Sequence, residues 1–152
     1  MAPDPQPRPR APALTVDAVV LSRGGEGLLD DGYRVLLVER GREPFRGRWA
    51  LPGGFVDYGE DPDLAVGREL AEETGLEGLP FRQFRAFGQP GRDPRGHTVS
   101  IVYVAVIIGD RPAVTGGDDA AAAAWHPLDG LPDLAFDHGA IVARVIENLK
   151  IR

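Results

Sequence analysis

Runs of apolar residues, separated by glycine, proline and aspartate, predict alternating strands and helices along this chain. β-Branched and aliphatic residues dominate 14–21, and a second such run occupies 33–38. The segment between them is rich in glycine and aspartate, so the two runs are expected to form a hairpin. Further strands are predicted at 81–87 and 98–108, joined by a loop at 88–96, and the long run 98–108 is expected to be central.

Two helices are predicted from their end signals and their apolar spacing. The first spans 62–74, because Asp61 can cap it, Pro62 suits its first turn and Gly75 fits the left-handed position after its end. The second begins after Asp137, a candidate cap. Its apolar residues recur at helical spacing and should form one stripe that packs on the sheet: Ile141, Val142, Val145, Ile146 and Leu149.

One segment allows two interpretations. The alanine run 120–124 favours a helix on propensity alone, but the flanking glycines and the following aromatic segment also allow a short strand. Residues 1–13 contain five prolines and almost no large apolar side chain, so they are expected to be a disordered tail. Residues 14–152 are expected to form one domain, since the whole chain of 152 residues suits a single hydrophobic core.

The amino-acid composition and the net charge exclude several classes of protein and of binding partner. Hydrophobic residues at 43% and charged residues at 26% are typical of a soluble globular protein, and no apolar run is long enough to span a membrane. The N-terminus lacks the apolar stretch of a secretory signal, so a cytoplasmic location is expected. The absence of cysteine excludes disulfides and zinc-thiolate sites. A net charge of -6 argues against nucleic acid or an anionic membrane as a partner.

The helix at 62–74 carries an unusual acidic face. Glu69, Glu72 and Glu73 fall within about 100° of one another on a helical projection. Like charges at these spacings destabilise an isolated helix by a few tenths of a kcal/mol per pair, and a solvated surface is the ordinary explanation of such a face. The opposite side is expected to pack on the sheet: Leu64, Gly67, Leu70, Ala71 and Thr74.

The residues around these glutamates change that interpretation. The chain contains Gly54, five residues, Glu60, seven residues, Arg68-Glu69-Leu70, one residue, Glu72-Glu73, one residue, and Gly75-Leu76. This spacing matches the Nudix box at every specified position, which happens by chance at a rate below about 10⁻⁸ per starting position. The chain therefore resembles the Nudix hydrolases. Independently of the family, carboxylates clustered on a rigid helix suit a hard divalent cation such as Mg²⁺.

The resemblance implies an α/β fold, the Nudix α/β/α sandwich with a mixed sheet. It also implies cleavage of a nucleoside diphosphate derivative by water, with Mg²⁺ or Mn²⁺. Carried over, Glu69 and Glu73 would be metal ligands, Glu72 a further ligand or the residue that activates water, and Gly53 a ligand through its carbonyl oxygen. Arg68 is expected to orient a glutamate rather than form only a surface ion pair with Glu72.

In this family the general base can also come from outside the box. Some members take it from a loop after the central strands, which makes Asp118 and Asp119 candidates here. The alternative is that these aspartates only form a polar turn after two glycines, because Asp and Gly are the usual turn residues.

Three further segments resemble the ADP-ribose pyrophosphatase branch of the family: 43–49, 92–96 followed by Ser100, and 136–138. A diphosphate that links two sugars needs basic groups at its oxygens. The candidate substrate-binding residues are Arg46, Arg48, Trp49, Arg92, Asp93 and Arg95. Trp49 either stacks on adenine or fills the core, and the core is favoured. His138 is expected to make a local structural contact rather than to act in catalysis.

The implied reaction is ADP-ribose plus water giving AMP and ribose 5-phosphate. The alternatives are a hydrolase of damaged nucleoside triphosphates, which uses the same box, and an ADP-ribose-sensing domain of a transcription factor. The sensor is disfavoured, because after the last predicted helix no residues are left for a DNA-binding module. The oligomeric state is left open, and a homodimer is one option.

Overall fold

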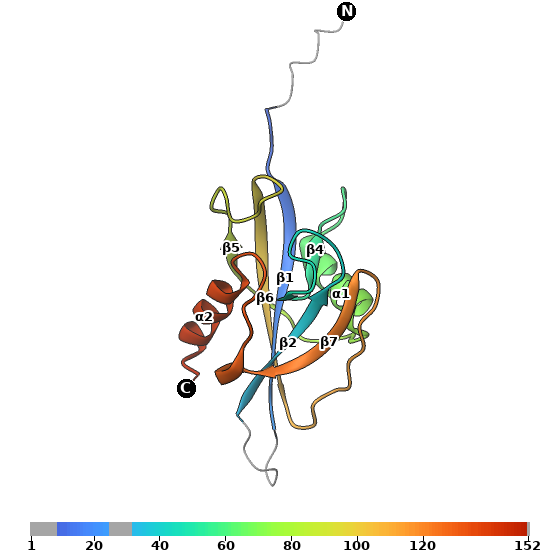
Figure 1. Cartoon of the computed structure of the whole chain (residues 1–152), viewed down its shortest axis with the longest axis vertical. Coiled ribbons are helices and arrows are strands. Elements are labelled where there is room, and N and C mark those ends of the chain that lie inside the picture. Colours follow the sequence, from blue (N-terminus) through green and yellow to red (C-terminus); the bar gives the residue numbers. More distant parts are fainter. Residues whose placement is uncertain (1–8, 25–31, 152) are drawn as a thin grey trace, which may run out of the picture.

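The computed structural model describes residues 9–24 and 32–151, in which a mixed sheet carries one helix on each face (Figure 1). The strands are β1 (Ala13–Arg23), β2 (Tyr33–Arg40), β3 (Trp49–Ala50), β4 (Gly53–Phe55), β5 (Arg82–Phe87), β6 (Thr98–Ile108) and β7 (Ala120–Pro127). The helices are α1 (Pro62–Thr74) and α2 (His138–Leu149), with a 3₁₀ turn, η1, at Leu128–Gly130.

The middle of the sheet is β1. The strand order is β3-β2-β1-β6-β5, with β4 also paired to β1 and β7 to β2. β1 runs antiparallel to β2 and β4 and parallel to β6, along eleven residue pairs from Ala13–Thr98 to Arg23–Ile108. Segment 98–108, expected to be central, is an interior strand beside the edge strand β5. The burial of β1 on both faces explains its continuous apolar run.

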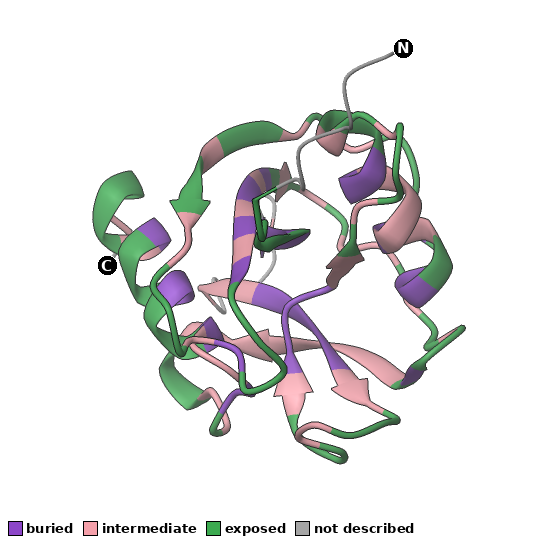
Figure 2. Cartoon of the chain, turned by 90° about the horizontal axis from the view of Figure 1, so that it is seen from above, coloured by how far each residue is buried: buried purple, intermediate pink, exposed green. Residues whose placement is uncertain are grey.

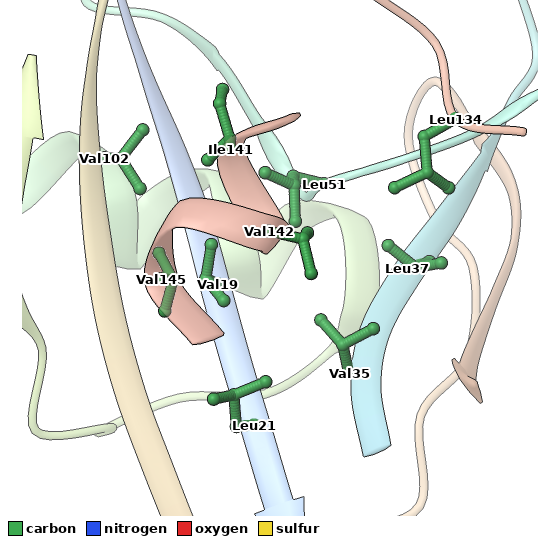
Figure 3. Close-up of a cluster of buried hydrophobic side chains, with 10 residues drawn as sticks. All are labelled: Val19, Leu21, Val35, Leu37, Leu51, Val102, Leu134, Ile141, Val142 and Val145. Carbon is green, nitrogen blue, oxygen red and sulfur yellow. The ribbon is translucent and has the colours of Figure 1, made fainter. Parts of the chain in front are cut away.

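Each face of the sheet buries its own apolar cluster. On one face Val19 and Val35 pack with Ile141, Val142 and Val145 of α2 (Figure 3). On the other face Val20 and Leu36 pack with Ala65, Val66 and Leu70 of α1. Figure 2 shows the same layering, since the buried residues gather on the sheet and on the inward sides of the helices. The predicted α/β/α sandwich with a mixed sheet is confirmed.

Helix α1 has the predicted ends, but only Leu70 and Thr74 of its predicted packing face are buried. The Asp61 side chain accepts a hydrogen bond from Asp63 N at 2.9 Å, and Gly75 ends the helix with φ 79°. Leu64, expected to pack, is 71% exposed. The buried residues of α1 are Ala65, Val66, Leu70, Glu73 and Thr74. The helix is therefore rotated so that one of its glutamates, Glu73, faces inward.

Helix α2 begins where predicted, but its cap works differently. Asp137 holds the N-cap position without a capping hydrogen bond from its side chain. Its carboxylate instead accepts two hydrogen bonds from Arg92, at 2.9 and 2.6 Å, because the loop before β6 brings a stronger donor. Of the predicted apolar stripe, Ile141, Val142 and Val145 are buried, whereas Leu149 is 42% exposed.

The alanine run 120–124 is a strand. It pairs with β2 as part of β7. The backbone hydrogen bonds that it makes with β2 outweigh the helical propensity of alanine. The predicted tail overlaps the fold at Ala13, which begins β1, and its first eight residues lie outside the described residues. The predicted turn of the first hairpin also lies largely outside them, although β1 and β2 do pair. Neither described helix has the length and apolar character needed to cross a membrane.

Candidate active site

A pocket of about 360 Å³ opens between the end of β2, β1, β4, α1 and the start of α2. This volume lies in the range of small-molecule sites. Eight of the predicted site residues line it: Gly53, Glu69, Glu73, Arg92, Asp93, Arg95, Asp118 and Asp119. The remaining five lie outside the lining: Arg46, Arg48, Trp49, Arg68 and Glu72.

The α1 side of the pocket is formed by Glu69 and Glu73, here called the carboxylate pair. Glu73 is only 9% exposed, and its Oε1 accepts a hydrogen bond from Gly53 N at 3.1 Å. A Cβ atom at Gly54 would lie 2.6 Å from the Glu69 carboxyl carbon, so only glycine permits this approach. Burial, with a further contribution from the nearby Glu69, raises the pKa of Glu73 to about 9. Burial also raises the pKa of Glu69.

Arg68 links the acidic residues beside the pocket. It donates to both carboxylate oxygens of Glu60, at 2.7 and 2.9 Å, and to Glu69 Oε1 at 3.0 Å. The hydrogen bonds from Arg68 lower the pKa of Glu60 to about 2. The sequence predicted that Arg68 orients a glutamate without saying which one; the structure shows contacts with Glu60, Glu69 and Glu72, of which the two-pronged contact with Glu60 was not predicted. The contact with Glu60 could have been suspected from the sequence, because the box specifies a glutamate at this position.

Glu72 is set apart from the carboxylate pair. Its side chain is 42% exposed and lies 3.3 Å from Arg68 Nη1. The three glutamates therefore do not share one acidic face as the helical projection predicted, because Glu73 is turned inward and Glu72 outward.

The loop before β7 brings Asp118 and Asp119 to the pocket. The segment is a turn, as the alternative interpretation held, and it also contributes to the lining. It packs against α1, since a Cβ at Gly117 would lie 2.7 Å from Glu72 O. Asp119 pairs with Arg42, while Asp118 has φ 52° and makes no side-chain hydrogen bond or ion pair with the described residues.

The loop between β5 and β6 carries Arg92, Asp93 and Arg95 into the lining. Arg92 is held by Asp137, and Arg95 is held by the buried Asp93, at 2.8 Å. The hydrogen bonds and charge of Arg95 hold the pKa of Asp93 low against its burial. The loop is thus fixed at two points, and the Arg95 guanidinium also stacks on Phe55, 4.9 Å from the ring centroid.

The segment before the box contributes less than the sequence predicted. Arg46 and Arg48 are exposed, and Arg48 lies over the Phe45 ring at 5.5 Å. Trp49 packs against the α2-side core and meets His126 edge-on, at 4.5 Å between ring centroids, which confirms the preferred core interpretation.

Three residues that line the pocket were not predicted as site residues: Arg40, Arg42 and Phe136, although segment 136–138 had been singled out by its resemblance to the ADP-ribose branch. Arg40 and Arg42 come directly at and after the end of β2, and Phe136 comes directly before the predicted N-cap of α2. Their positions could have suggested a role, because side chains at strand ends and helix starts often form binding sites. Arginines occur at many such positions in this chain, so position alone did not single out these residues.

A buried polar network supports the pocket from behind. Ser100 Oγ donates to Asp17 Oδ2 at 2.5 Å, and His138 Nε2 lies 3.6 Å from Asp17 Oδ1. His138 Nδ1 accepts from Leu51 N at 2.9 Å, which assigns the ring proton to Nε2. Burial lowers the pKa of His138 and raises that of Asp17. The network ties α2 to β1, β6 and the segment before Gly53. His138 therefore makes structural contacts as expected, but with distant segments rather than locally, and it also lines the pocket.

The comparison with known families agrees with this geometry. The model of the NUDIX domain matches residues 12–149, nearly the whole chain. The chain belongs to the Nudix family. The box extends from β4 through α1. Its residues Gly54, Glu69 and Glu73 line one pocket, together with Gly53, which comes directly before the box.

Individual Nudix proteins are similar over most of the chain. An ADP-ribose pyrophosphatase of Methanocaldococcus jannaschii is 42% identical over 131 residues, covering 86% of this chain and 71% of the relative. The ADPR responsive transcriptional repressor NtrR of Acinetobacter baylyi is 33% identical; the match covers 91% of this chain and 55% of the repressor. The NUDIX domain of Shewanella oneidensis NrtR, solved in complex with ADP ribose, superposes with a TM-score of 0.82 at 35% identity, covering 96% and 93% of the two chains.

Nudix hydrolases generally use divalent metals, and the donor chemistry here fits one. Two desolvated carboxylates lie side by side at the pocket, and their raised pKa values reflect the cost of leaving both charged without a cation. Within the described residues no group of three or more His, Asp or Glu side chains is arranged to hold a metal ion by itself. A carboxylate pair that leaves further positions to water and phosphate oxygens is what Mg²⁺ prefers.

Proposed function

We propose that this Nudix protein hydrolyses ADP-ribose to AMP and ribose 5-phosphate, with Mg²⁺ or Mn²⁺ bound at the carboxylate pair. One observation carries the proposal. A single pocket is lined both by two desolvated carboxylates and by arginines, which is the charge arrangement that a metal-bound diphosphate requires. The ADP-ribose pyrophosphatase relative and the neighbour complexed with ADP ribose support this choice of substrate.

The metal would be held by Glu69 and Glu73, with the carbonyl oxygen of Gly53 as a further donor. A bound divalent cation would neutralise the diphosphate and lower the pKa of an attacking water. Arg68 keeps Glu69 in place through its hydrogen bond at 3.0 Å. The Gly53 N–H does the same for Glu73. These two contacts fix the donors before any ligand arrives, so little reorganisation is needed during the reaction.

The proton from water needs an acceptor, for which three carboxylates are candidates. Glu72 is held by Arg68 outside the pocket lining, and Asp119 is paired with Arg42. Asp118 lines the pocket with its carboxylate unpaired among the described residues, so we assign it as general base. Asp118→Asn should then lower kcat more than Asp119→Asn or Glu72→Gln, and an equal kcat for Asp118→Asn and the unmodified protein would remove Asp118 from this role.

Substrate contacts are assigned to the loop between β5 and β6. Arg95 lines the pocket and supplies a cation to the substrate, whereas Arg92 and Asp93 fix the loop that carries it. Arg46 and Arg48 lie outside the lining and are not assigned. The partner is a small nucleotide and not nucleic acid, which the net charge of -6 supports.

The deciding experiment is a panel of nucleotide substrates assayed with Mg²⁺ and with the products resolved. We expect kcat/KM for ADP-ribose to exceed that for any nucleoside triphosphate by at least about tenfold, or roughly 1.4 kcal/mol in transition-state binding. Faster cleavage of an oxidised deoxynucleoside triphosphate would favour the alternative of a sanitising hydrolase. Tight ADP-ribose binding without turnover would instead favour a sensor, as in the repressor relative. The Glu73→Gln variant controls for contaminating hydrolases.

A further inference from the structure

Arg40 is the pocket arginine least engaged by the protein itself. Its Nε donates to Pro44 O at 2.7 Å, and its guanidinium lies over the Phe136 ring at 4.9 Å. Among the described residues this is its one side-chain hydrogen bond, and it has no ion pair. Arg42 and Arg92, by contrast, are each paired with an aspartate. The charges of Glu73, Asp93 and Asp17 favour the charged form of Arg40, but none of these carboxylates forms an ion pair with it, so its guanidinium keeps donors for an anion in the pocket.

The backbone directs Arg40 to this position. The pairing of β2 with β7 shifts by one residue between Glu39 and Arg40, so that Arg40 pairs with Ala120. Such irregularities re-aim side chains and are common beside active sites. The next residue, Gly41, approaches the other strand closely, since a Cβ there would lie 2.8 Å from Asp119 O.

A second arginine meets the same aromatic ring. The Arg95 guanidinium lies 5.3 Å from the Phe136 centroid, so Arg40 and Arg95 place two cations on one ring; we call them the arginine pair. Burial lowers the pKa of Arg40, and the charge of Arg95 lowers it further. Two like charges this close repel each other in the free protein, and an anion bound between them would turn that repulsion into attraction.

The ring that both guanidinium groups contact belongs to a residue whose backbone has a conformation that phenylalanine rarely adopts. Phe136 has φ 52°, and Phe45, whose ring meets it edge-on at 4.8 Å, has φ 62°. Bulky residues in this backbone region are uncommon, and they concentrate at functional sites. The ring therefore sits where the two guanidinium groups can both reach it.

We propose that Arg40 is a substrate-binding residue that works together with Arg95 to hold the diphosphate oxygens that the metal does not. This inference rests on the proposed function only in taking the bound anion to be a diphosphate. Guanidinium groups suit this role because each presents several donors in a planar fork, which matches phosphate oxygens. Two of them, set on one ring, match two linked phosphates better than a single phosphate.

The test compares Arg40→Gln with a matched control, Arg144→Gln, which alters an exposed arginine of α2 outside the pocket lining. The probe is inorganic pyrophosphate, titrated by calorimetry at a fixed excess of Mg²⁺. Arg40→Gln should weaken pyrophosphate binding by about tenfold or more, since it removes a charge-assisted contact. Arg144→Gln should leave it unchanged. Equal pyrophosphate affinity in the unmodified protein and Arg40→Gln would overturn the inference.

Two further measurements separate binding from a merely structural role. The KM for ADP-ribose should rise in Arg40→Gln, while the Mg²⁺ concentration for half-maximal activity stays the same, because the carboxylate pair is intact. A raised Mg²⁺ requirement with unchanged pyrophosphate affinity would contradict substrate binding by Arg40. Should Arg40→Gln fold poorly, Arg40→Lys keeps the charge but not the planar fork, and it should show an intermediate loss of pyrophosphate affinity.

The two proposals fail in different ways. If the unmodified protein does not cleave ADP-ribose but Arg40→Gln still loses pyrophosphate affinity, the proposed substrate is wrong and Arg40 keeps its role. If ADP-ribose is cleaved and pyrophosphate binds Arg40→Gln normally, the reaction stands and the role of Arg40 is refuted. A double-variant cycle adds a check, since Arg40→Gln and Arg95→Gln should be non-additive if both groups bind one anion, and additive losses would contradict a shared anion.

Discussion

The carboxylate pair and the arginine pair face the same pocket but are built in different ways. Glu69 and Glu73 are four residues apart on one helix, so helical geometry alone brings them together. Arg40 and Arg95 come from the end of β2 and from the loop between β5 and β6, and both reach the ring of Phe136, which comes from the segment before α2. The first pair depends on local structure, and the second depends on the whole fold.

The largest expected effect comes from the carboxylate pair. Glu73→Gln should lower kcat by at least about a hundredfold, because a neutral amide is a weak ligand for Mg²⁺ and provides little charge for the transition state. The fold should persist, as judged by circular dichroism. Glu77→Gln, an exposed glutamate after the helix end and outside the lining, is the matched control. Near-normal rates in both Glu69→Gln and Glu73→Gln would refute the metal-site assignment.

The next largest effect is expected from Arg68, which holds Glu69 of the carboxylate pair in place. Arg68→Lys keeps the positive charge but loses the two-pronged contact with Glu60 and weakens the contact with Glu69. Supporting residues around a metal site are typically worth about 10- to 100-fold in metal affinity or activity. We therefore expect a higher Mg²⁺ concentration for half-maximal activity, read from metal titrations of the initial rate. An unchanged titration would mean that Glu69 needs no support from Arg68.

A smaller effect is expected on the arginine side, where selectivity rather than the chemical step should change. Arg95→Ala should reduce the preference for ADP-ribose over nucleoside triphosphates by about tenfold, measured as the ratio of their kcat/KM values. Arg85→Ala is the control, because Arg85 also stacks on a phenylalanine, Phe87 at 4.4 Å, but lies outside the pocket lining. An unchanged ratio in Arg95→Ala would locate the selectivity elsewhere.

The smallest effect is on stability in the absence of metal. The folded-state pKa of Glu73, about 9, lies above its ordinary value of 4.5, so its stabilising contribution is complete below pH 4.5 and is lost as pH rises toward 9. The lowered pKa of His138 acts in the opposite direction, but only below its ordinary value of 6.5. The melting temperature in EDTA should therefore fall by a few degrees between pH 7 and pH 9, and it should fall less in Glu73→Gln. An equal fall in the unmodified protein and in Glu73→Gln would show that Glu73 does not cause the pH dependence.

Added Mg²⁺ should oppose that loss. A cation that binds only the folded state raises the melting temperature, and the carboxylate pair binds it better as both groups become ionised. The difference between melting curves in Mg²⁺ and in EDTA should thus grow with pH. Coincident curves at pH 8 would count against a carboxylate pair that is ready to bind metal.

The same contrast explains how much could be predicted from the sequence. The bounds of α1 were predicted correctly because Asp61, Pro62 and Gly75 act within one or two residues of the helix ends. The glutamate spacing likewise identified the family and the acidic side of the pocket. These are short-range relations, and a single sequence contains them in full.

The errors concern residues whose neighbours come from distant segments. Leu64 was assigned to the packed face of α1, but how a helix rotates on a sheet depends on the sheet it meets. Asp137 occupies a cap position yet binds Arg92, 45 positions earlier in the chain. Arg46 and Arg48 were chosen because segment 43–49 resembles the ADP-ribose branch, but they lie outside the pocket lining, whereas Arg40, at the end of β2, lies within it.

The parallel pairing of β1 with β6 has a consequence for how the protein is made. Each of its eleven pairs joins residues about 85 positions apart, from Ala13–Thr98 to Arg23–Ile108. Contacts at such separations form late, because a long loop must close before they contribute. During synthesis β1 therefore emerges first but lacks its parallel neighbour until most of the chain has left the ribosome. The glutamate helix can form early, and the pocket it faces is completed only when the last third of the chain arrives.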